Sequence, residues 1–482
     1  MKIFFRKNIY SICLGIVIFI GILLRLKGFV TNPSLWHDEC ALGWNILNKN
    51  GIELFYEKLR FLQVAPPLFL LFTKFFVWLF HAKSNVFLCD FTLRFLPFIF
   101  GNLSVIIFYF VCKSLYNSKW TTLVAVFLFC LNPVLINYTF EFKPYIIDVF
   151  AALSVLWIFL NINIKDIKLK KLLIYSGVLA FLPWFSFTSV IVEFAGFLML
   201  SYKKENPKNF FILFSPTVLS IFIYIKTFII RTYVQNSEGM LDYWQNVFVN
   251  KDLSNITQLN LQNLHYFFAN LPFFSCTLFS LLLITGAFLF FKDYKLRFLL
   301  MSILVEATLI IMSIMKIYPY STRLLIFLIP FLIIFGVKIF DIKNKAFASI
   351  LILFIVIPHI LFLLKFMQLK TVDKGYFPRE MIINMHNNIN PNDIIIINKS
   401  SNVEFLYYNT FFDFKNKWEI TSIKDFLNKS DNLSNVTCWF YMPFLESKSI
   451  QNELFQWLNI NSNIEFKLQQ KYSLLLKTKI KY

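Results

Sequence analysis

The chain has 482 residues, of which 57% are hydrophobic, 19% aromatic and only 15% charged, and its mean hydropathy is +0.62. This apolar content exceeds the roughly 45–50% of soluble domains, which excludes a purely soluble fold. The net charge of +20 does not indicate nucleic-acid binding, because the Lys and Arg residues lie in short clusters between apolar segments, as in cytoplasmic loops of membrane proteins.

The first apolar stretch follows a basic start and runs to about Phe29. No cleavage site of the small-x-small type follows it, so we interpret it as an uncleaved first helix. This stretch and eight further apolar runs are long enough to span a bilayer, for which about 17–25 residues are needed. The nine runs cover residues 10–29, 94–112, 120–139, 145–162, 209–230, 270–291, 297–315, 323–340 and 346–366. A longer run at 172–202 has Pro183 at its centre and predicts two short helices, which brings the expected total to eleven.

Clusters of basic residues orient these helices, because cytoplasmic loops carry an excess of Lys and Arg. Five clusters agree with one topology, at 113–119, 165–171, 203–208, 292–297 and 338–345. The N-terminus is then cytoplasmic. The segments outside the cytoplasm are the loops at 30–93, 139–144, 231–269 and 316–322 and the tail from about 367.

The apolar segment 63–81 would invert every later loop if it crossed the membrane. It has Pro66 and Pro67 near its start and Lys74 at its centre, which favours a helix lying in the external interface, where Arg60 and Lys83 can meet lipid phosphates. The alternative is a tilted spanning helix, with another segment misassigned.

The chain becomes more polar after this membrane part. Runs at 394–397 and 439–442 predict strands and 447–458 predicts a helix, while the aromatic and Ile content argues against a disordered tail. The predicted fold is an all-α polytopic membrane domain over 1–366, with about eleven transmembrane helices and interfacial helices in the loop 30–93. A small extracytoplasmic α/β domain over 367–482 follows.

The first external loop presents adjacent acids, Asp38 and Glu39, after His37. A carboxylate at the bilayer surface can deprotonate an acceptor hydroxyl or amine, or hold a divalent cation. Adjacent residues on a helix point about 100° apart, so only one acid is expected to face a given cavity. An acid pair that merely favours the helix N-terminus is the structural alternative.

The second external turn places Glu141 and Lys143 on the face of Asp38, with Asp148 one turn inside the membrane. An unpaired carboxylate there costs about 2.5–3.5 kcal/mol, so Asp148 needs a partner or a water-filled cavity. Lys143 is the nearest cation in sequence, and a salt bridge that only anchors the helix end is the alternative to a function.

A third external turn carries Tyr318, Tyr320 and Arg323. An Arg beside Tyr hydroxyls suits a phosphate or pyrophosphate group, although snorkelling to lipid headgroups explains Arg323 equally well. Arg94 and Lys83 allow the same two interpretations.

Several short segments resemble the C-type glycosyltransferases of the protein O-mannosyltransferase and aminoarabinose transferase superfamily. The matching segments are 34–39 (SLWHDE), 65–69 (APPLF), 94–97 (RFLP) followed by Gly101, 132–133 (NP) and 138–145, with 323–325 (RLL) opening a late helix. The resemblance implies a polyprenyl-phosphate-linked sugar as donor and an acidic pair in the first external loop.

The acidic pair Asp38 and Glu39 is predicted to be catalytic. By this resemblance Asp38 is the catalytic carboxylate and Glu39 its neighbour. The residues expected to contact substrates are His37, Glu141, Lys143, Tyr145, Asp148, Tyr320 and Arg323. A divalent cation is a second use for Asp38, no metal ligand is otherwise assigned, and no other cofactor is expected.

The leading hypothesis is an inverting transferase of the cell membrane, dependent on undecaprenyl phosphate or a related carrier, that acts on a lipid, glycan or protein acceptor outside the cytoplasm. Asp38 would be the base, while Lys143 and Arg323 would neutralise the leaving phosphate. A flippase or transporter of lipid-linked oligosaccharides is the second hypothesis, although no internal repeat of the kind found in many transporters is visible. A non-catalytic protein that retains the transferase scaffold is a third.

Overall fold

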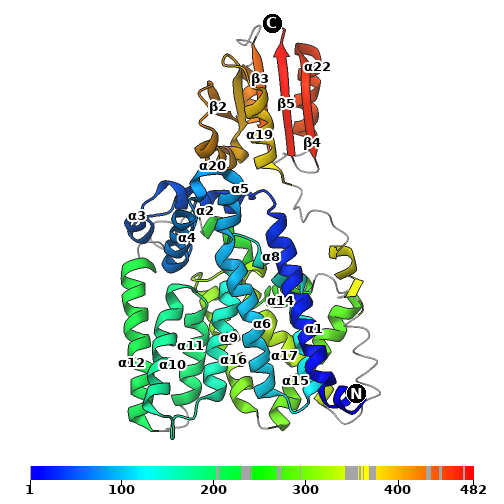
Figure 1. Ribbon diagram of the computed structural model, residues 1–482. Coiled ribbons are helices and arrows are strands. Elements are labelled where there is room, and N and C mark those ends of the chain that lie inside the picture. The colour runs from blue at the N-terminus through cyan, green and yellow to red at the C-terminus, as the bar shows by residue number, and fades with distance from the viewer. Residues whose placement is uncertain are drawn as a thin grey trace.

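The computed structural model shows a tall helical bundle capped at one end by a sheet domain, with the N-terminus at the opposite end (Figure 1). The structure describes residues 2–201, 206–229, 239, 241–268, 273–293, 295–341, 357, 360–361, 363–367, 376–429, 436–443, 448–470 and 473–481. The fold is therefore mostly helical with a small C-terminal sheet, as the sequence predicts.

Within this described part, five helical stretches are long and apolar enough to cross a membrane: Asn8–Thr31, Val86–Leu115, Pro207–Phe228, Leu296–Ile314 and Thr322–Asp341. A sixth is a pair bent by 54°, α7 (Lys119–Leu131) with α8 (Pro133–Thr139). The bend falls where Pro133 has no N–H to continue the helix and Asn132 Oδ1 accepts from Leu135 N at 3.0 Å. The predicted count of eleven spans is not confirmed.

The remaining predicted spans have mixed outcomes. Two short helices, α10 (Leu169–Phe181) and α11 (Ser189–Ser201), occupy the run 172–202, as expected for a hairpin. Helices α9 (Tyr145–Asn161) and α15 (Phe273–Lys292) occupy two others. The predicted span at 346–366 lies largely outside the described residues.

Helices from the early and the late parts of the membrane domain pack together in the bundle. The long α1 (Lys2–Thr31) packs on α7, and α6 (Phe95–Leu115), which continues α5 (Val86–Leu93), packs on α9. The later helices are α12 (Pro207–Tyr224), α14 (Ile256–Phe267), α16 (Leu296–Ile314), η5 (Thr322–Leu328) and α17 (Ile329–Val337). The η5 segment packs on α9 and α14, which brings a late part of the chain to the second external turn.

The loops predicted to be cytoplasmic meet at one end of the bundle. Lys338 Nζ lies 2.6 Å from an Asp293 carboxylate oxygen, and Arg297 Nη1 donates to Ile162 O at 2.7 Å. Lys295 Nζ reaches Ser114 O at 3.5 Å. These contacts join the clusters at 113–119, 292–297 and 338–345 and bring them to the end of α9 at Ile162, which is consistent with the predicted grouping of these loops. The side of the membrane on which they lie stays a prediction.

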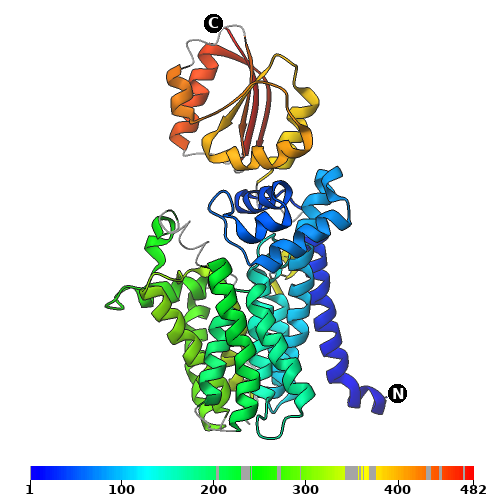
Figure 2. The same ribbon diagram turned by 90° about the vertical axis from the view of Figure 1, so that its left-hand side faces the viewer.

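The first long loop forms a separate layer between the bundle and the sheet domain (Figure 2). It contains α2 (His37–Asn48), α3 (Gly51–Tyr56), α4 (Pro67–Leu79) and η1 (Ala82–Ser84). Helix α4 has 13 residues, hence a length of about 20 Å against a hydrocarbon core of about 30 Å, which suits a helix that does not cross. Lys74 Nζ and Lys83 Nζ donate to Ile46 O and Leu47 O, at 2.8 and 2.7 Å. Both cations therefore complement the C-terminus of α2, and neither was expected to do so.

The C-terminal part folds around a five-stranded mixed sheet with the order β2-β1-β3-β5-β4. Its strands are β1 (Ile394–Asn398), β2 (Trp418–Thr421), β3 (Thr437–Met442), β4 (Ser462–Gln470) and β5 (Ser473–Ile480). The first three are parallel, and β5 pairs antiparallel with both β3 and β4. The helices are α19 (Pro378–Asn388), α20 (Asn402–Phe412), α21 (Ile423–Lys429) and α22 (Lys448–Asn461). Helix α20 packs on α2, so this domain lies directly against the loop that carries the acidic pair.

Candidate active site

The acidic pair lies in the first turn of α2, where carboxylates are favoured by the helix dipole. The two side chains diverge, as the 100° step between helix neighbours predicts. Glu39 Oε2 accepts from Trp36 N at 3.2 Å, which caps the helix start, and the Glu39 side chain is only 1% exposed. Asp38 is 20% exposed. Of the two acids, only Asp38 is therefore accessible from solvent.

Glu39 is held in a buried ion pair with Arg94, which joins α5 to α6. Arg94 Nε and Nη2 each lie 3.1 Å from a different carboxylate oxygen of Glu39, a bidentate arrangement. Glu39 Oε1 also accepts from Phe142 N at 2.6 Å, so the same carboxylate fixes the second external turn. The Arg94 side chain is only 2% exposed and is occupied by Glu39, which contradicts both interpretations from sequence, a contact with lipid headgroups and a contact with a substrate phosphate.

Asp38 pairs with Arg323 at the beginning of η5. Arg323 Nη1 donates to Asp38 Oδ2 at 2.9 Å, and Arg323 is likewise 20% exposed. Two aromatic residues that sequence reasoning missed complete its surroundings: Arg323 Nη2 donates to Tyr243 Oη at 3.2 Å, and its guanidinium lies 5.0 Å from the Trp244 ring centroid. The only sequence signal for them is an adjacent aromatic pair in the predicted external loop 231–269.

Lys143 lies behind this pair, buried in the second external turn. Its Nζ donates to Gln63 Oε1 at 2.6 Å, and Gln63 is another residue that sequence reasoning missed. Burial alone would raise the pKa of Asp38, but the charges of Lys143 and Arg323 outweigh burial and lower that pKa. Burial lowers the pKa of Lys143, although the Asp38 charge opposes this change. Asp38 is therefore ionised at neutral pH between two cations.

The neighbouring predicted residues form the wall of the same region. Glu141 is buried beside Lys143, and its charge acts on Lys143 and on Tyr145 at the start of α9. Tyr145 also lies close enough to Asp38 and Arg323 to feel their charges. His37, the first residue of α2, lies next to Asp38, and its Nδ1 is 3.1 Å from Glu404 Oε1 of the C-terminal domain.

Two predicted residues have their polar contacts elsewhere. Ser186 Oγ donates to Asp148 Oδ1 at 2.6 Å, so the hairpin turn, and not the nearby Lys143, supplies a partner for this carboxylate. Tyr320 Oη donates to Asn260 Oδ1 at 2.7 Å and is also hydrogen-bonded to Glu306. The alternative of a salt bridge between Lys143 and Asp148 is therefore not supported, because each has another polar partner. Tyr320 is 3% exposed.

The described residues contain no group of three or more His, Cys, Asp or Glu side chains that could hold a metal ion. At Asp38 the donor set is a single carboxylate, and the nearest charges are the cations Lys143 and Arg323. A site of this charge suits an anion, whereas Mg²⁺ and Ca²⁺ prefer several oxygen ligands. The residues therefore do not fit a resident divalent cation.

Solved structures of other proteins share the fold of this chain. None of the protein-family models and none of the curated proteins matches this sequence. Among solved structures, ArnT from Cupriavidus metallidurans bound to undecaprenyl phosphate matches with a TM-score of 0.57 and 9% identity, over 98% of this chain and 98% of ArnT.

Two structures of the Archaeoglobus fulgidus oligosaccharyltransferase also match. The apo form has a TM-score of 0.54 and 14% identity, over 96% of this chain and 70% of that enzyme. The complex of AglB with an inhibitory peptide and a dolichol-phosphate has a TM-score of 0.52 and 11% identity, over 91% and 70% of the two chains. The chain thus has the fold of the C-type glycosyltransferases, the superfamily that its sequence resembles.

Proposed function

We propose that this chain is an integral membrane glycosyltransferase that moves a sugar from a polyprenyl-phosphate carrier to a lipid, glycan or protein acceptor outside the cytoplasm. One observation carries the proposal: the partly exposed region around Asp38 combines a single ionised carboxylate with the cations Lys143 and Arg323. A base and an anion-binding site side by side are what this reaction needs. The solved structures of the same fold support the choice of carrier, since ArnT was solved bound to undecaprenyl phosphate and AglB in complex with a dolichol-phosphate.

Asp38 is the proposed general base. Its Oδ2 accepts from Arg323, whereas its Oδ1 accepts no hydrogen bond from any residue that the structure describes. Oδ1 can therefore take the proton of an acceptor hydroxyl or amine. A positioned base contributes about 10²- to 10⁴-fold to such a reaction.

Arg323 and Lys143 are the proposed ligands of the carrier phosphate. As the acceptor oxygen or nitrogen attacks C1 of the sugar from the opposite face, the C1–O bond breaks and its electron pair passes to the phosphate. The guanidinium has five N–H donors, and its bonds to Asp38 and Tyr243 use two of them. Donors that are already oriented toward developing negative charge lower the barrier.

Glu39 was grouped with Asp38 as catalytic on the basis of sequence. Its burial and its bonds to Arg94 and Phe142 favour a structural role, in which it ties α2 to α6 and to the turn that carries Lys143. We therefore assign the base to Asp38 alone, and we derive no step through a metal ion.

Deletion of the gene and complementation with wild type or Asp38→Asn test this function. Mass spectrometry of envelope lipids, glycans and proteins is expected to show the loss of one sugar unit in the deletion strain, its return with wild type, and no return with the variant. A transporter would move the lipid-linked sugar without cleaving it. Release of free undecaprenyl phosphate by the wild type therefore separates the two hypotheses.

A further inference from the structure

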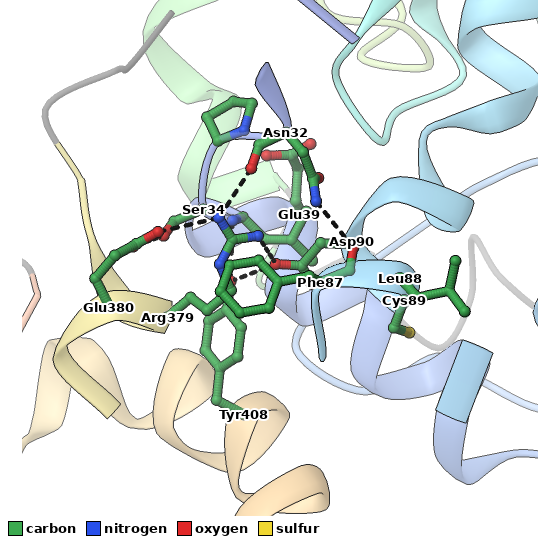
Figure 3. Close-up of polar contacts among 12 residues, drawn as sticks. Asn32, Ser34, Glu39, Phe87, Leu88, Cys89, Asp90, Arg379, Glu380 and Tyr408 are labelled. Carbon is green, nitrogen blue, oxygen red and sulfur yellow. Dashed lines mark hydrogen bonds and ion pairs between the residues drawn. The ribbon is translucent and has the colours of Figure 1, made fainter. Parts of the chain in front are cut away.

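The C-terminal domain is anchored to the first external loop by a buried polar cluster around Asp90 of α5 (Figure 3). Arg379 Nη1 lies 2.8 Å from Asp90 Oδ2, and the hydroxyls of Tyr407 and Tyr408 donate to Asp90 at 2.8 and 3.1 Å. Asp90 is 0% exposed. A buried charge with this many partners fixes the position of α19 and α20 against the bundle.

A second cluster extends the anchor toward the acidic pair. Arg379 Nη2 donates to Asn32 O at 2.8 Å, and Glu380 is hydrogen-bonded to Ser34 (Figure 3). Leu35 N donates to Tyr408 Oη at 3.0 Å. The C-terminal domain therefore holds the segment that leads directly into α2, only a few residues before Asp38.

This docking places Glu404 of α20 against His37, the residue before Asp38. Its Oε1 lies 3.1 Å from His37 Nδ1, and its side chain is only 3% exposed. Its other oxygen is buried and has no hydrogen-bond partner among the described residues. A buried carboxylate left partly unsatisfied is costly, so its one strong contact with His37 calls for a role beyond packing.

The two ring nitrogens of His37 have different surroundings: Nδ1 faces the C-terminal domain, and Nε2 faces the region of Asp38. Nδ1 is engaged by Glu404, Nε2 makes no hydrogen bond to a described residue, and the ring is 38% exposed. A carboxylate that accepts from Nδ1–H orients the ring and favours its protonated form, and in that cationic form Nε2 also carries a proton, which points toward the site.

The charged groups that face His37 come from three elements: Glu404 from α20, Asp38 from α2 and Lys143 from the second external turn. Burial lowers the pKa of His37. The hydrogen bond and charge of Glu404, with the charge of Asp38, outweigh burial and the opposing charge of Lys143, so the pKa is raised. The cationic form is favoured, and it is lost only as the pH rises through that raised pKa.

We propose that Glu404 is a positioning residue supplied by the C-terminal domain, which orients the His37 ring and retains its proton so that Nε2–H donates to the phosphate of the lipid donor. This inference rests on the proposed function. His37 would then be a third cationic contact beside Lys143 and Arg323, and the C-terminal domain would complete the active site. No bond to His37 forms or breaks, because its hydrogen bond only neutralises charge on the phosphate.

The first test measures the proton on His37 and does not depend on activity. The chain has five histidines, so selective ¹³C labelling of the His rings of the full protein in nanodiscs gives few signals, and loss of one signal in His37→Gln assigns it. We expect Glu404→Gln to lower the pKa of His37. The matched control is Glu380→Gln, at the same interface but bonded to Arg379 and Ser34, and it is expected to leave this pKa unchanged. An unchanged pKa in Glu404→Gln would overturn the proposal.

The second test measures the affinity of the same samples for undecaprenyl phosphate at pH 5.5 and pH 7. Glu404→Gln is expected to weaken binding at pH 7 and to match wild type at pH 5.5, where acid restores the proton on His37. His37→Gln is expected to weaken binding at both pH values, and the double variant no further. A loss in Glu404→Gln that persists at pH 5.5 would show that Glu404 has a purely structural role and refute the proposal.

The failure of the proposed function has a different signature. If wild type neither binds undecaprenyl phosphate nor releases it from a lipid-linked sugar, the function itself fails and the phosphate contact of His37 fails with it. If wild type does both and Glu404→Gln behaves like wild type at every pH, only the role of Glu404 is overturned.

Discussion

Asp38 and Arg323 are 285 residues apart in the chain, yet Arg323 Nη1 lies 2.9 Å from Asp38 Oδ2. The bond joins the first external loop to a late helix and places a carboxylate and a guanidinium at the same partly exposed position.

Arg323→Ala is expected to weaken undecaprenyl phosphate binding about 10- to 100-fold, because a hydrogen bond to a charged group contributes about 1.5–3 kcal/mol. Arg323→Lys keeps the charge but loses the planar fork, so a smaller loss is expected. Arg297→Ala is the control, since Arg297 donates to Ile162 O at the opposite end of the bundle. Equal affinities for Arg323→Ala and wild type in a binding titration would remove Arg323 from the phosphate site.

Glu39→Gln is expected to reduce stability by about 3–5 kcal/mol, because it leaves Arg94 as a buried charge without its ionised partner. Asp38→Asn lies at a position that is 20% exposed and should cost much less. Thermal unfolding in nanodiscs, followed by tryptophan fluorescence, compares the two variants directly. A Glu39→Gln protein as stable as Asp38→Asn would contradict the structural role of Glu39.

Lys143 makes donor binding sensitive to alkaline pH. Burial lowers its pKa, so its charge is present at low pH and is lost as the pH rises through that lowered value, before an ordinary lysine would titrate. Undecaprenyl phosphate affinity is therefore expected to fall on the alkaline side. Lys143→Arg should remove the part of this fall that Lys143 causes, because arginine remains protonated, and should leave only the earlier loss caused by deprotonation of His37. An identical alkaline fall in both proteins would assign it to another group.

Asp90→Asn is expected to loosen the C-terminal domain, because Arg379 and two tyrosine hydroxyls lose the charge that they share. Hydrogen exchange should become faster in α19, in α20 and at the start of α2, whereas β4 and β5, which pair within the sheet, should be unaffected. Uniform exchange changes over the whole domain would instead indicate that the domain itself unfolds.

Much of the grouping of site residues could be predicted from sequence. The alternation of apolar runs and basic clusters placed Asp38, Lys143 and Arg323 in loops of the same side, since hydropathy and loop charge are readable from the sequence. The helix step of 100° predicted that only one of the two acids would face a cavity, and Glu39 does turn away.

Pairing between distant segments could not be predicted. Arg94 was interpreted as a phosphate or lipid contact because nothing in sequence indicates that α2 turns Glu39 toward it. Lys143 was the nearest cation to Asp148 in sequence, and a salt bridge between them was one interpretation, but the fold brings Gln63 to Lys143 and Ser186 to Asp148. Glu404 gave no signal at all, because its proximity to His37 depends on how the C-terminal domain docks.

The most direct test of the proposed function is release of free undecaprenyl phosphate from an undecaprenyl-phosphate-linked sugar, with purified protein in liposomes and an envelope extract as the source of acceptor. Wild type is expected to release the carrier phosphate in parallel with sugar transfer. Asp38→Asn should release none, although it still binds undecaprenyl phosphate and unfolds at a similar temperature. Transfer by Asp38→Asn at the wild-type rate would contradict the assignment of Asp38 as the base.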